Sequence, residues 1–354
     1  MPRVWDVPVH DSTRVRDARV AAEHAAALAG LDERRTSTAA LVATELATNL
    51  LKHAGGGRVL IDVVAPAVLN TGREGSSQVQ VTTIDHGPGI ADVSAALRDG
   101  FTTTGSLGAG LGTCARLADD FDLHSVPGRG TVVVARLGAV PDARAAESGP
   151  ATRLRAGAVN LPFGGADYSG DAWAWVRDGD LVTLMLADGL GHGPEAARAS
   201  SAAVDALRAS AGLRPAEAVR RLDRALSGTR GAAVAVAQVD TRAGVLRFTG
   251  VGNIGARLCE GGTWRHLVSR PGIVGTHRPS TLREEEAVWA DDRVLVLHSD
   301  GLPSRWSPTS DTCRTATDPA VTAAVTIRDA SSPARPVRDD TAVAVLAPTP
   351  PDRS

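Results

Sequence analysis

The sequence predicts an α+β protein of two domains, and three observations support this. With 354 residues, the chain is longer than one ordinary domain of roughly 100 to 200 residues. Two regions with helical and strand-like periodicity flank the stretch GAVPDARAAESGPA at 138–151, which has neither period and suits a linker. Short strand-like runs dominate the second region, as in antiparallel sheets covered by helices. We therefore expect domains at 1–137 and 152–347, followed by a disordered tail at 348–354.

Local patterns define the elements of the first domain. A helix at 37–53 is expected because Val42, Leu46 and Leu50 recur every four residues and mark an apolar face. The glycines at 55–57 then end it. The expected elements are a strand near 4–7, helices at 13–28 and 37–53, strands at 59–64 and 78–84, and a hairpin of 120–126 with 131–137.

The second domain is expected to contain more strands than helices. The predicted elements are strands at 173–176, 181–187, 232–239, 245–249, 293–298 and 341–346, with helices at 194–211 and 215–227. The stretch 303–336 mixes Ser, Thr, Pro and Arg, and we expect it to be partly mobile.

Composition and charge exclude several classes of function. The 38 Lys and Arg residues nearly balance the 40 Asp and Glu residues, and no basic cluster for nucleic acid stands out. Cys114, Cys259 and Cys313 form no CxxC pair, which argues against a disulfide framework and a zinc site. The N-terminus lacks a secretory signal, and no run of about 18 apolar residues occurs. We expect a cytoplasmic protein that binds neither nucleic acid nor membrane.

A first candidate site lies on the helix at 37–53. Helical spacing places Glu45, Asn49 and Lys52 or His53 along one stripe beside the apolar face. A carboxylate can orient a proton-bearing nucleophile, and an amide one turn later can bind a magnesium ion on phosphates. The alternative for this motif alone is a polar helix flank.

An aspartate in a glycine-containing turn follows the strand at 78–84. Asp85 shares this turn with Gly87 and Gly89, which allow a ligand to approach closely. The Asp85 carboxylate can accept a hydrogen bond from an adenine amino group. This motif favours the interpretation of the preceding helix motif as part of a nucleotide site.

A glycine-rich loop and a final short motif complete the series. The loop containing Gly108, Gly110, Leu111 and Gly112 leads into a helical stretch, whose free N–H groups suit phosphate. Thr131 follows a Gly-Arg-Gly turn just before the last strand of the domain. A lone glycine-rich loop is weak evidence, but here it belongs to a set of four motifs in a fixed order.

That order resembles the GHKL ATP-binding (Bergerat) fold of histidine kinases and anti-sigma-factor serine kinases, an α/β sandwich, over residues 1–137. The compact form is most similar to the RsbT-type switch kinases of the stressosome. The resemblance implies ATP with Mg²⁺, Glu45 as catalytic base, Asn49 as magnesium ligand and Asp85 as the adenine-reading residue. The further nucleotide-binding residues that it implies are Lys52, Gly87, Gly89, Gly108, Gly110, Leu111, Gly112 and Thr131.

Four aspartates form a second candidate site, because each stands where a predicted strand begins or ends. They are Asp171, Asp188, Asp300 and Asp339, with Asp340 as the alternative to the last. Hard carboxylate oxygens suit Mg²⁺ or Mn²⁺ rather than zinc. If the fold brings them together, two ions can share a water, lower its pKa and direct it at phosphorus. Each Asp-Gly pair taken singly is more often an ordinary turn.

As a set, four motifs resemble the PPM-type phosphatases, and most of all the SpoIIE and RsbX branch. The motifs are GGADYSGD at 164–171, LADGLGHG at 186–193, HSDGL at 298–302 and DDTAV at 339–343. The resemblance implies a PPM-type β-sandwich flanked by helices, with two Mg²⁺ or Mn²⁺ ions. Asp188 would bridge the ions with help from the Gly189 carbonyl, while Asp171, Asp300 and Asp339 complete the ligand set.

The chain departs from many PPM phosphatases after the second motif. Those proteins have His directly after the Asp-Gly pair, whereas this chain has Leu190 there and His192 two positions further on. His192 is the candidate proton donor to the leaving serine, with a supporting residue or an ordinary turn histidine as alternatives. Asn253 either lines the site or stands in a structural bend, and the bend is favoured.

Together the two resemblances predict opposing reactions on hydroxyl side chains. The kinase half would phosphorylate a STAS-domain protein of a partner-switching or stressosome pathway, and the phosphatase half would reverse this. A sigma factor or a stressosome complex is a further possible partner. Fusion raises the local concentration of both sites near a shared partner. One alternative makes the first domain a non-catalytic module that binds ATP or a sigma factor. Another is an inactive scaffold, which the presence of all the site residues argues against.

Overall fold

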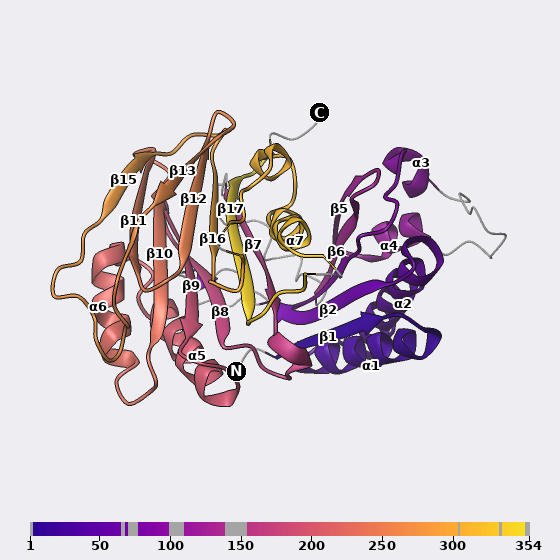
Figure 1. Ribbon diagram of the computed structural model, residues 1–354, viewed down its shortest axis with the longest axis horizontal. Coiled ribbons are helices and arrows are strands. Elements are labelled where there is room, and N and C mark those ends of the chain that lie inside the picture. Colours follow the sequence, from indigo (N-terminus) through magenta and orange to yellow (C-terminus); the bar gives the residue numbers. More distant parts are fainter. Residues whose placement is uncertain are drawn as a thin grey trace.

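The computed structural model describes residues 3–64, 68–69, 77–98, 110–138, 154–303, 305–332 and 335–350. The expected linker beyond Gly138, and residues 351–354 of the expected tail, lie outside the described residues. Figure 1 shows one lobe from each half of the chain, with a helix of the second half between them.

The first half forms one antiparallel sheet in the order β1-β2-β4-β6-β5, and helices α1 and α2 cover one of its faces. Ala22, Val42 and Val81 lie in the core between these two layers. Every strand and helix predicted for this half is present, with ends shifted by a few residues. The bounds are β1 Val4–Val9, α1 Ser12–Leu28, α2 Glu33–Asn49, β2 Gly57–Val64, β4 Gln78–Ile84, α3 Val93–Leu97, α4 Leu111–Leu117, β5 Asp120–Val126 and β6 Gly130–Gly138.

Helix α2 carries the first candidate site at its C-terminal end. Asp32 begins the helix by accepting a hydrogen bond from the Arg35 N–H at 2.7 Å. After Asn49 the chain continues as a π-helical turn, Leu50–Ala54, and ends at Gly55 with φ of 71°. The polar stripe therefore lies next to an irregular turn, which widens the end of the helix.

The second half is a sandwich of two mainly antiparallel sheets. The strand orders are β13-β12-β16-β17-β7 and β14-β11-β10-β9-β8-β3, with β15 beside β11. Leu186, Phe248 and Leu297 fill the space between the sheets, and α5 and α6 cover the outer face of the larger one. The bounds are β3 Val68–Leu69, β7 Leu154–Leu161, β8 Asp171–Asp178, β9 Leu181–Gly189, α5 Pro194–Arg208, α6 Pro215–Ala225, β10 Ala232–Asp240, β11 Val245–Val251, β12 Gly255–Glu260, β13 Thr263–Leu267, β14 Ser269–Arg270, β15 Glu285–Val288, β16 Val294–His298 and β17 Thr341–Pro348.

Helix α7, Pro319–Ala330, corrects the expectation of mobility at 303–336. Asp318 caps it by accepting a hydrogen bond from the Ala320 N–H at 2.8 Å, and Pro319 occupies the first turn. Every residue from Pro319 to Arg328 is buried, so the helix has no solvent-facing side. The sequence signals for this helix are a capping Asp, a Pro in the first turn and a run of Ala and Val.

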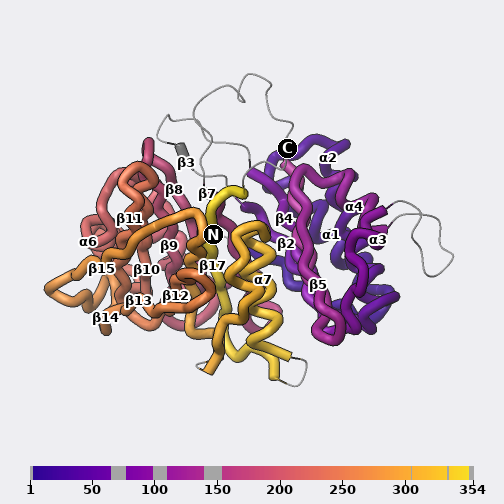
Figure 2. The backbone as a smooth tube through the Cα atoms, turned by 90° about the horizontal axis from the view of Figure 1, so that it is seen from above, coloured from indigo at the N-terminus to yellow at the C-terminus, as the bar shows by residue number. Residues whose placement is uncertain are grey.

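Helix α7 fills the space between the two halves (Figures 1 and 2). One side packs on β7 and β17, and the other packs on the sheet face that α1 and α2 leave open. Leu60 and Val132 of the first half share one core cluster with Val321 of α7. At the start of the helix, the Asp318 carboxylate accepts hydrogen bonds from Arg136 of β6 at 2.8 and 2.9 Å. The two halves are therefore joined by a shared core and a bidentate ion pair.

Cys259 of β12 and Cys313 form a disulfide, so the expectation that no disulfide forms is wrong. Their Cα atoms are 5.9 Å apart, although 54 residues separate them in sequence. Cys313 lies just before α7, and the packing of that helix brings it to β12. Cys114 is buried and is the free cysteine of the described chain.

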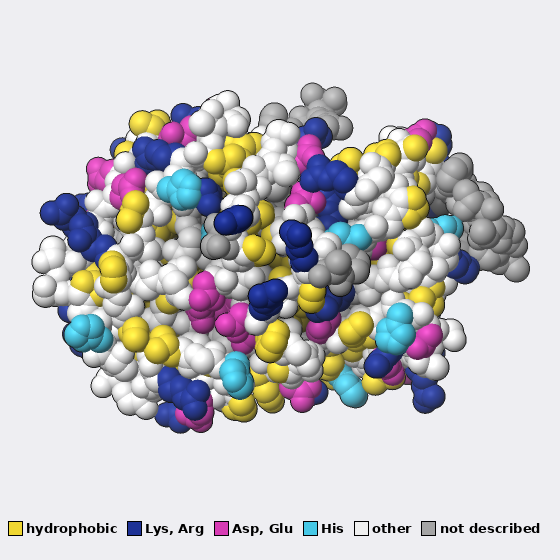
Figure 3. Space-filling view, in the orientation of Figure 1, with side chains coloured by type: hydrophobic (Ala, Val, Ile, Leu, Met, Phe, Trp, Pro, Cys, Tyr) yellow, Lys and Arg dark blue, Asp and Glu magenta, His cyan; other side chains and the backbone are white. Residues whose placement is uncertain are grey.

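Charged side chains of both signs are interspersed over the face shown in Figure 3, in keeping with the balanced composition. Within the described ranges, no helix combines the length and the apolar character needed to cross a lipid bilayer.

The carboxyl of Asp62 is expected to make stability depend on pH. Asp62 lies on β2 and is 9% exposed, and burial raises its pKa to about 7 although Arg136 and Gln80 oppose the shift. The pKa of an unfolded Asp is about 3.9, so between about pH 4 and 7 the folded chain retains a proton that the unfolded chain has lost. Asp62 therefore lowers the free energy of unfolding as pH rises through this window.

Asp62→Asn is expected to remove this penalty. The melting temperature should rise strongly at pH 8 and change little at pH 4. The stability lost by burying the ionised Asp62 is largest at pH 8. There, each tenfold difference in proton affinity between the folded and unfolded chains lowers the free energy of unfolding by about 1.4 kcal/mol. Calorimetry at the two pH values measures this. Asp120→Asn, at an exposed position of β5, is the control. An equal effect of Asp62→Asn at both pH values would contradict the assignment.

Candidate nucleotide and metal sites

The first site is built on the last turns of α2. Glu45 and Asn49 are one helical turn apart, and burial raises the pKa of the Glu45 carboxyl while Lys52 opposes the shift. The side-chain nitrogen of Asn49 is buried and has no hydrogen-bond partner in the described part of the chain. A buried amide N–H without a hydrogen-bond partner destabilises a packed core. It is typical of a position where a bound ligand supplies the missing partner. Lys52 and His53 are exposed.

Asp85 stands at the end of β4 and is 7% exposed. Its Oδ1 accepts hydrogen bonds from the Gly87 N–H at 2.8 Å and the Thr131 N–H at 3.1 Å. Burial raises the pKa of this carboxyl, and those two hydrogen bonds oppose the shift. A Cβ at Gly87 would lie 2.7 Å from the Cα of Ala54, so only glycine lets this turn pack against the end of the π-helix. Gly89 follows in the same turn with φ of 72°.

The glycine-rich loop is described only at its end. Gly108 lies outside the described residues, whereas Gly110 precedes α4 and Leu111 and Gly112 form its first turn. Space is open where a Gly110 side chain would stand. On α4, burial raises the pKa of the Cys114 thiol to about 12 and the charge of Glu45 adds to the shift, so this thiol is a poor nucleophile.

These residues suit an adenine nucleotide with a divalent ion. They supply an unpartnered amide at Asn49, a buried carboxylate at Asp85 and a glycine-opened turn between them. Fold packing brings α2, the turn after β4 and the start of α4 together, although more than sixty residues separate Asn49 from Leu111 in sequence.

The second site lies where the two sheets of the sandwich meet at one end. Asp171 begins β8 and faces Asp188 near the end of β9 in the antiparallel register. Asp300 follows β16 and Asp339 precedes β17, which are neighbours in the other sheet. The Asp340 side chain joins the two sheets, because its Oδ2 accepts a hydrogen bond from the Gly170 N–H at 2.7 Å. The fold thus gathers all four predicted acids at one end of the sandwich.

Charge and burial act together in this acidic cluster. Asp171 is completely buried, and neither of its carboxylate oxygens has a hydrogen-bond partner in the described chain. Burial raises its pKa well above the ordinary value, and the charge of Asp188 adds to this. The Ser299 hydroxyl lies near the carboxylate, outside hydrogen-bond geometry, and opposes the shift. Burial and then the charges of Asp300 and Asp339 raise the pKa of Asp188 to about 7. A buried carboxylate without partners suits a cation ligand.

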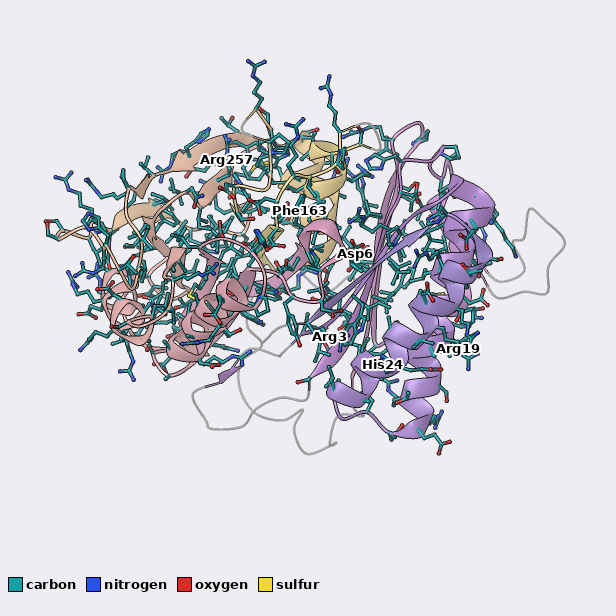
Figure 4. All side chains as sticks on the ribbon, turned by 60° about the horizontal axis from the view of Figure 1, so that its bottom comes forward. Arg3, Asp6, Arg19, His24, Phe163 and Arg257 are labelled. Carbon is teal, nitrogen blue, oxygen red and sulfur yellow. A yellow bond between two sulfur atoms is a disulfide. The ribbon has the colours of Figure 1, made fainter. Side chains whose placement is uncertain are left out.

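The structure distinguishes Asp339 from Asp340. Both oxygens of Asp340 accept backbone hydrogen bonds at 2.7 Å, from Gly170 and from Phe163 at the junction of the two domains (Figure 4). Asp339 is exposed, and among the described residues its side chain accepts a hydrogen bond only from the next N–H, at 2.8 Å to Oδ1. Asp339 therefore has the freer carboxylate, and Asp340 fastens the loop at 163–170.

The acids are not arranged as a complete metal-coordination site. Among the described residues, no three His, Cys, Asp or Glu side chains are arranged closely enough to hold a metal ion as they stand. The Asn253 side chain donates a hydrogen bond to Asp300 Oδ2 at 2.6 Å. Asn253 thus lines the site, whereas the sequence favoured a structural bend. The hard oxygen donors suit Mg²⁺ or Mn²⁺, and closing on an ion requires side-chain rotation. Gly189 lies opposite Ala232 at the same end of the sheet.

His192 lies at the rim of the acidic cluster. It is exposed. Burial raises the pKa of Asp340, and the proximity of His192 slightly opposes that rise. Two further residues of the site carried no signal in the sequence. Asn160 of β7 donates a hydrogen bond to the Asp171 carbonyl at 2.8 Å, and Ser299 accepts one from the Ala342 N–H at 2.9 Å.

Removal of divalent ions is expected to lower the melting temperature. Bound ions at 100 times their Kd contribute about 2.7 kcal/mol, and without them the carboxylates repel one another. A shift of roughly 5 to 10 °C between Mn²⁺ and EDTA is expected for a domain of this size. Asp171→Asn should show a much smaller difference in the same calorimetric comparison. An unchanged melt of the unmodified chain would count against the metal site.

Comparisons with known proteins match the two halves of the chain separately. A family model described as histidine kinase-like ATPase domain matches residues 9–137, and one described as stage II sporulation protein E (SpoIIE) matches residues 178–348. The serine/threonine-protein kinase RsbT of Bacillus subtilis (strain 168) is 41% identical over 105 residues, which cover 30% of this chain and 71% of RsbT.

Several solved structures are similar to parts of the chain. One, described under "The bacterial stressosome: a modular system that has been adapted to control secondary messenger signaling", has a TM-score of 0.48 and 28% identity, covering 55% of this chain and 98% of that one. RsbX with magnesium has a TM-score of 0.47 and 19% identity over 55% of this chain and 94% of that one. A SpoIIE fragment from Bacillus subtilis has a TM-score of 0.47 and 15% identity, over 96% and 98%.

Proposed function

Since this chain belongs to the RsbT family of kinase-like ATPases through its N-terminal half and carries a SpoIIE-type, PP2C-class serine/threonine phosphatase domain in its C-terminal half, we propose that the two halves act in opposite directions on one protein substrate. The kinase half adds phosphate to a Ser or Thr, and the phosphatase half removes it. The completely buried, unpartnered carboxylate of Asp171 beside three further acids carries the phosphatase half of this proposal.

In the kinase half we assign the roles by position. Asp85 would accept a hydrogen bond from the adenine amino group, and Asn49 would hold, through its side-chain oxygen, the Mg²⁺ that accompanies the ATP phosphates. Glu45, whose pKa burial raises, is placed to accept the proton of the substrate hydroxyl. Gly110, Leu111 and the other loop residues named above contribute N–H groups and space for phosphate.

In the phosphatase half, Asp188 with the Gly189 carbonyl would bridge two Mg²⁺ or Mn²⁺ ions. Asp171, Asp300 and Asp339 complete the ligands, and Asn253 orients Asp300 through its hydrogen bond. When bound, the ions supply Lewis acidity and a water of lowered pKa. His192 at the rim is positioned to give a proton to the leaving serine.

The proposed substrate is a STAS-domain protein of a partner-switching or stressosome pathway. The RsbT relationship of the first domain supports this choice. The shared core around α7 supports action by both halves on the same partner, because it holds the two sites on one body.

The test mixes the purified chain, labelled ATP with Mg²⁺, and purified STAS-domain proteins. We expect label on a Ser or Thr of one partner, and release of inorganic phosphate from that phosphorylated partner when ATP is removed. Phosphate release without any label transfer would instead make the first domain a non-catalytic ATP- or sigma-factor-binding module. The absence of both reactions with every partner would overturn the proposal.

A further inference from the structure

The turn that holds Asp85 also touches α7. The next residue, His86, projects its Nε2 to two backbone carbonyls at the end of that helix, Arg328 O at 3.0 Å and Ser331 O at 3.1 Å. Because both partners are acceptors, Nε2 carries the hydrogen and donates to both. Carbonyls at a helix C-terminus lack partners within the helix, so His86 caps α7 from the other domain.

A second contact joins the same two parts. The Arg328 side chain is fully buried, and its Nη1 donates a hydrogen bond to Gly130 O at 3.3 Å. Gly130 packs against the Asp85 turn so closely that a Cβ there would lie 2.8 Å from the Cα of His86. Arg129 adds a hydrogen bond to Asp329 of α7 at 2.6 Å. Both loops that flank Asp85 are therefore fastened to the last turn of α7.

The same turn of α7 leads directly to the metal site. Asp339 follows the end of the helix by nine residues, and a pair of hydrogen bonds between Ser332 and Arg335, at 2.9 and 3.1 Å, tightens the connection. The other end of α7 is held by Arg136. The Asp85 turn is thus connected to Asp339 through the last turn of α7 and the nine residues after it.

We infer that His86 is a positioning residue that couples the nucleotide site to the phosphatase metal site through the C-terminal end of α7. Metal ions bound by Asp339 would fix the position of the C-terminal end of α7, and His86 would then hold the Asp85 turn in one arrangement. The nucleotide binds this ordered turn at a lower entropic cost. The coupling is reciprocal, so nucleotide also favours metal binding by the same factor. This inference rests on the two sites proposed above and adds a route of regulation between them.

The test is a double-mutant cycle read by nucleotide affinity, not by activity. A fluorescent ADP analogue is titrated at one Mg²⁺ concentration into the unmodified chain, Asp188→Asn, His86→Ala and the double variant. We expect Asp188→Asn to weaken nucleotide binding about fivefold or more, the lower end of typical coupling, and to change it less than about twofold in the His86→Ala background.

Two variants make the result specific. His86→Gln keeps an N–H donor of similar reach and should restore the effect of Asp188→Asn. His24→Ala, on α1 at the helix-covered face of the sheet (Figure 4), should leave the coupling as it is in the unmodified chain. Equal effects of Asp188→Asn with and without His86 would overturn the inference.

Equilibrium dialysis with Mn²⁺ separates this outcome from a failure of the proposed function. If Asp188→Asn loses bound Mn²⁺ but nucleotide affinity does not change, the metal site stands and the coupling is wrong. If Mn²⁺ binding is the same in both proteins, the metal site and the coupling are both wrong.

Discussion

Asp188→Asn is expected to reduce phosphatase turnover by about 10³-fold, with partner phosphorylation by the kinase half retained at saturating ATP. Asp188 lies opposite Asp171 in the sheet register, and burial together with Asp300 and Asp339 raises its pKa to about 7. Such a concentration of negative charge stabilises bound cations. A loss of about 4 kcal/mol of metal-based stabilisation of the transition state corresponds to that fold-change. The measurement is release of phosphate from a phosphorylated partner under single-turnover conditions.

The loss of phosphatase turnover in Asp188→Asn should result from the altered metal site and not from unfolding of the domain. In the absence of ions, a carboxylate with a raised pKa lowers stability above about pH 4, so the neutral amide should leave the EDTA-treated chain at least as stable. Asp291→Asn, in an exposed turn of the same domain, is the matched control and should keep full turnover. A variant at Asp188 that retained more than a tenth of the turnover would refute the bridging role.

Asn49→Ala is expected to reduce transfer of phosphate from ATP to the partner by about 10- to 200-fold, while phosphatase turnover persists. The estimate corresponds to about 1.5 to 3 kcal/mol for one contact to a charged group. Because the Asn49 nitrogen has no hydrogen-bond partner in the described chain, its removal breaks no contact of the folded protein there. The variant should therefore melt close to the unmodified chain, and label transfer reports the loss.

Thr38→Ala provides the comparison on the same helix. Thr38 makes a hydrogen bond to the Arg34 carbonyl at 2.9 Å, one turn earlier and remote from the Asn49 end. It should transfer phosphate at the normal rate. Unaltered phosphate transfer by Asn49→Ala would contradict the magnesium role of this residue. In the same assay, accumulation of phosphorylated partner with Asp188→Asn would show that both halves act on that partner.

Local signals predicted most of the regular elements. The four-residue spacing of Val42, Leu46 and Leu50 identified α2, and strand-like runs located most strands of both halves. The helical signal failed for α7. This helix has no solvent-facing side, so helical periodicity was absent, and only the capping Asp318, Pro319 and a run of Ala and Val marked it. Strands β7, β12 and β13 and three shorter ones, β3, β14 and β15, were also missed.

The sequence by itself determined which chemistry is available, because residue type decides it. Carboxylates at Asp171, Asp188, Asp300 and Asp339, and an amide at Asn49 before Asp85, are hard oxygen and hydrogen-bonding groups in any arrangement. Local pattern also showed that the acids stand at the ends of strands.

Only the tertiary structure decided which groups meet. Strand pairing set Asp171 against Asp188, and backbone hydrogen bonds engaged Asp340 and left Asp339 freer. The Cys259 disulfide and the contact of His86 with α7 join residues separated by 54 and 242 positions. Such contacts depend on how whole layers pack on one another, and no short stretch of sequence encodes that packing.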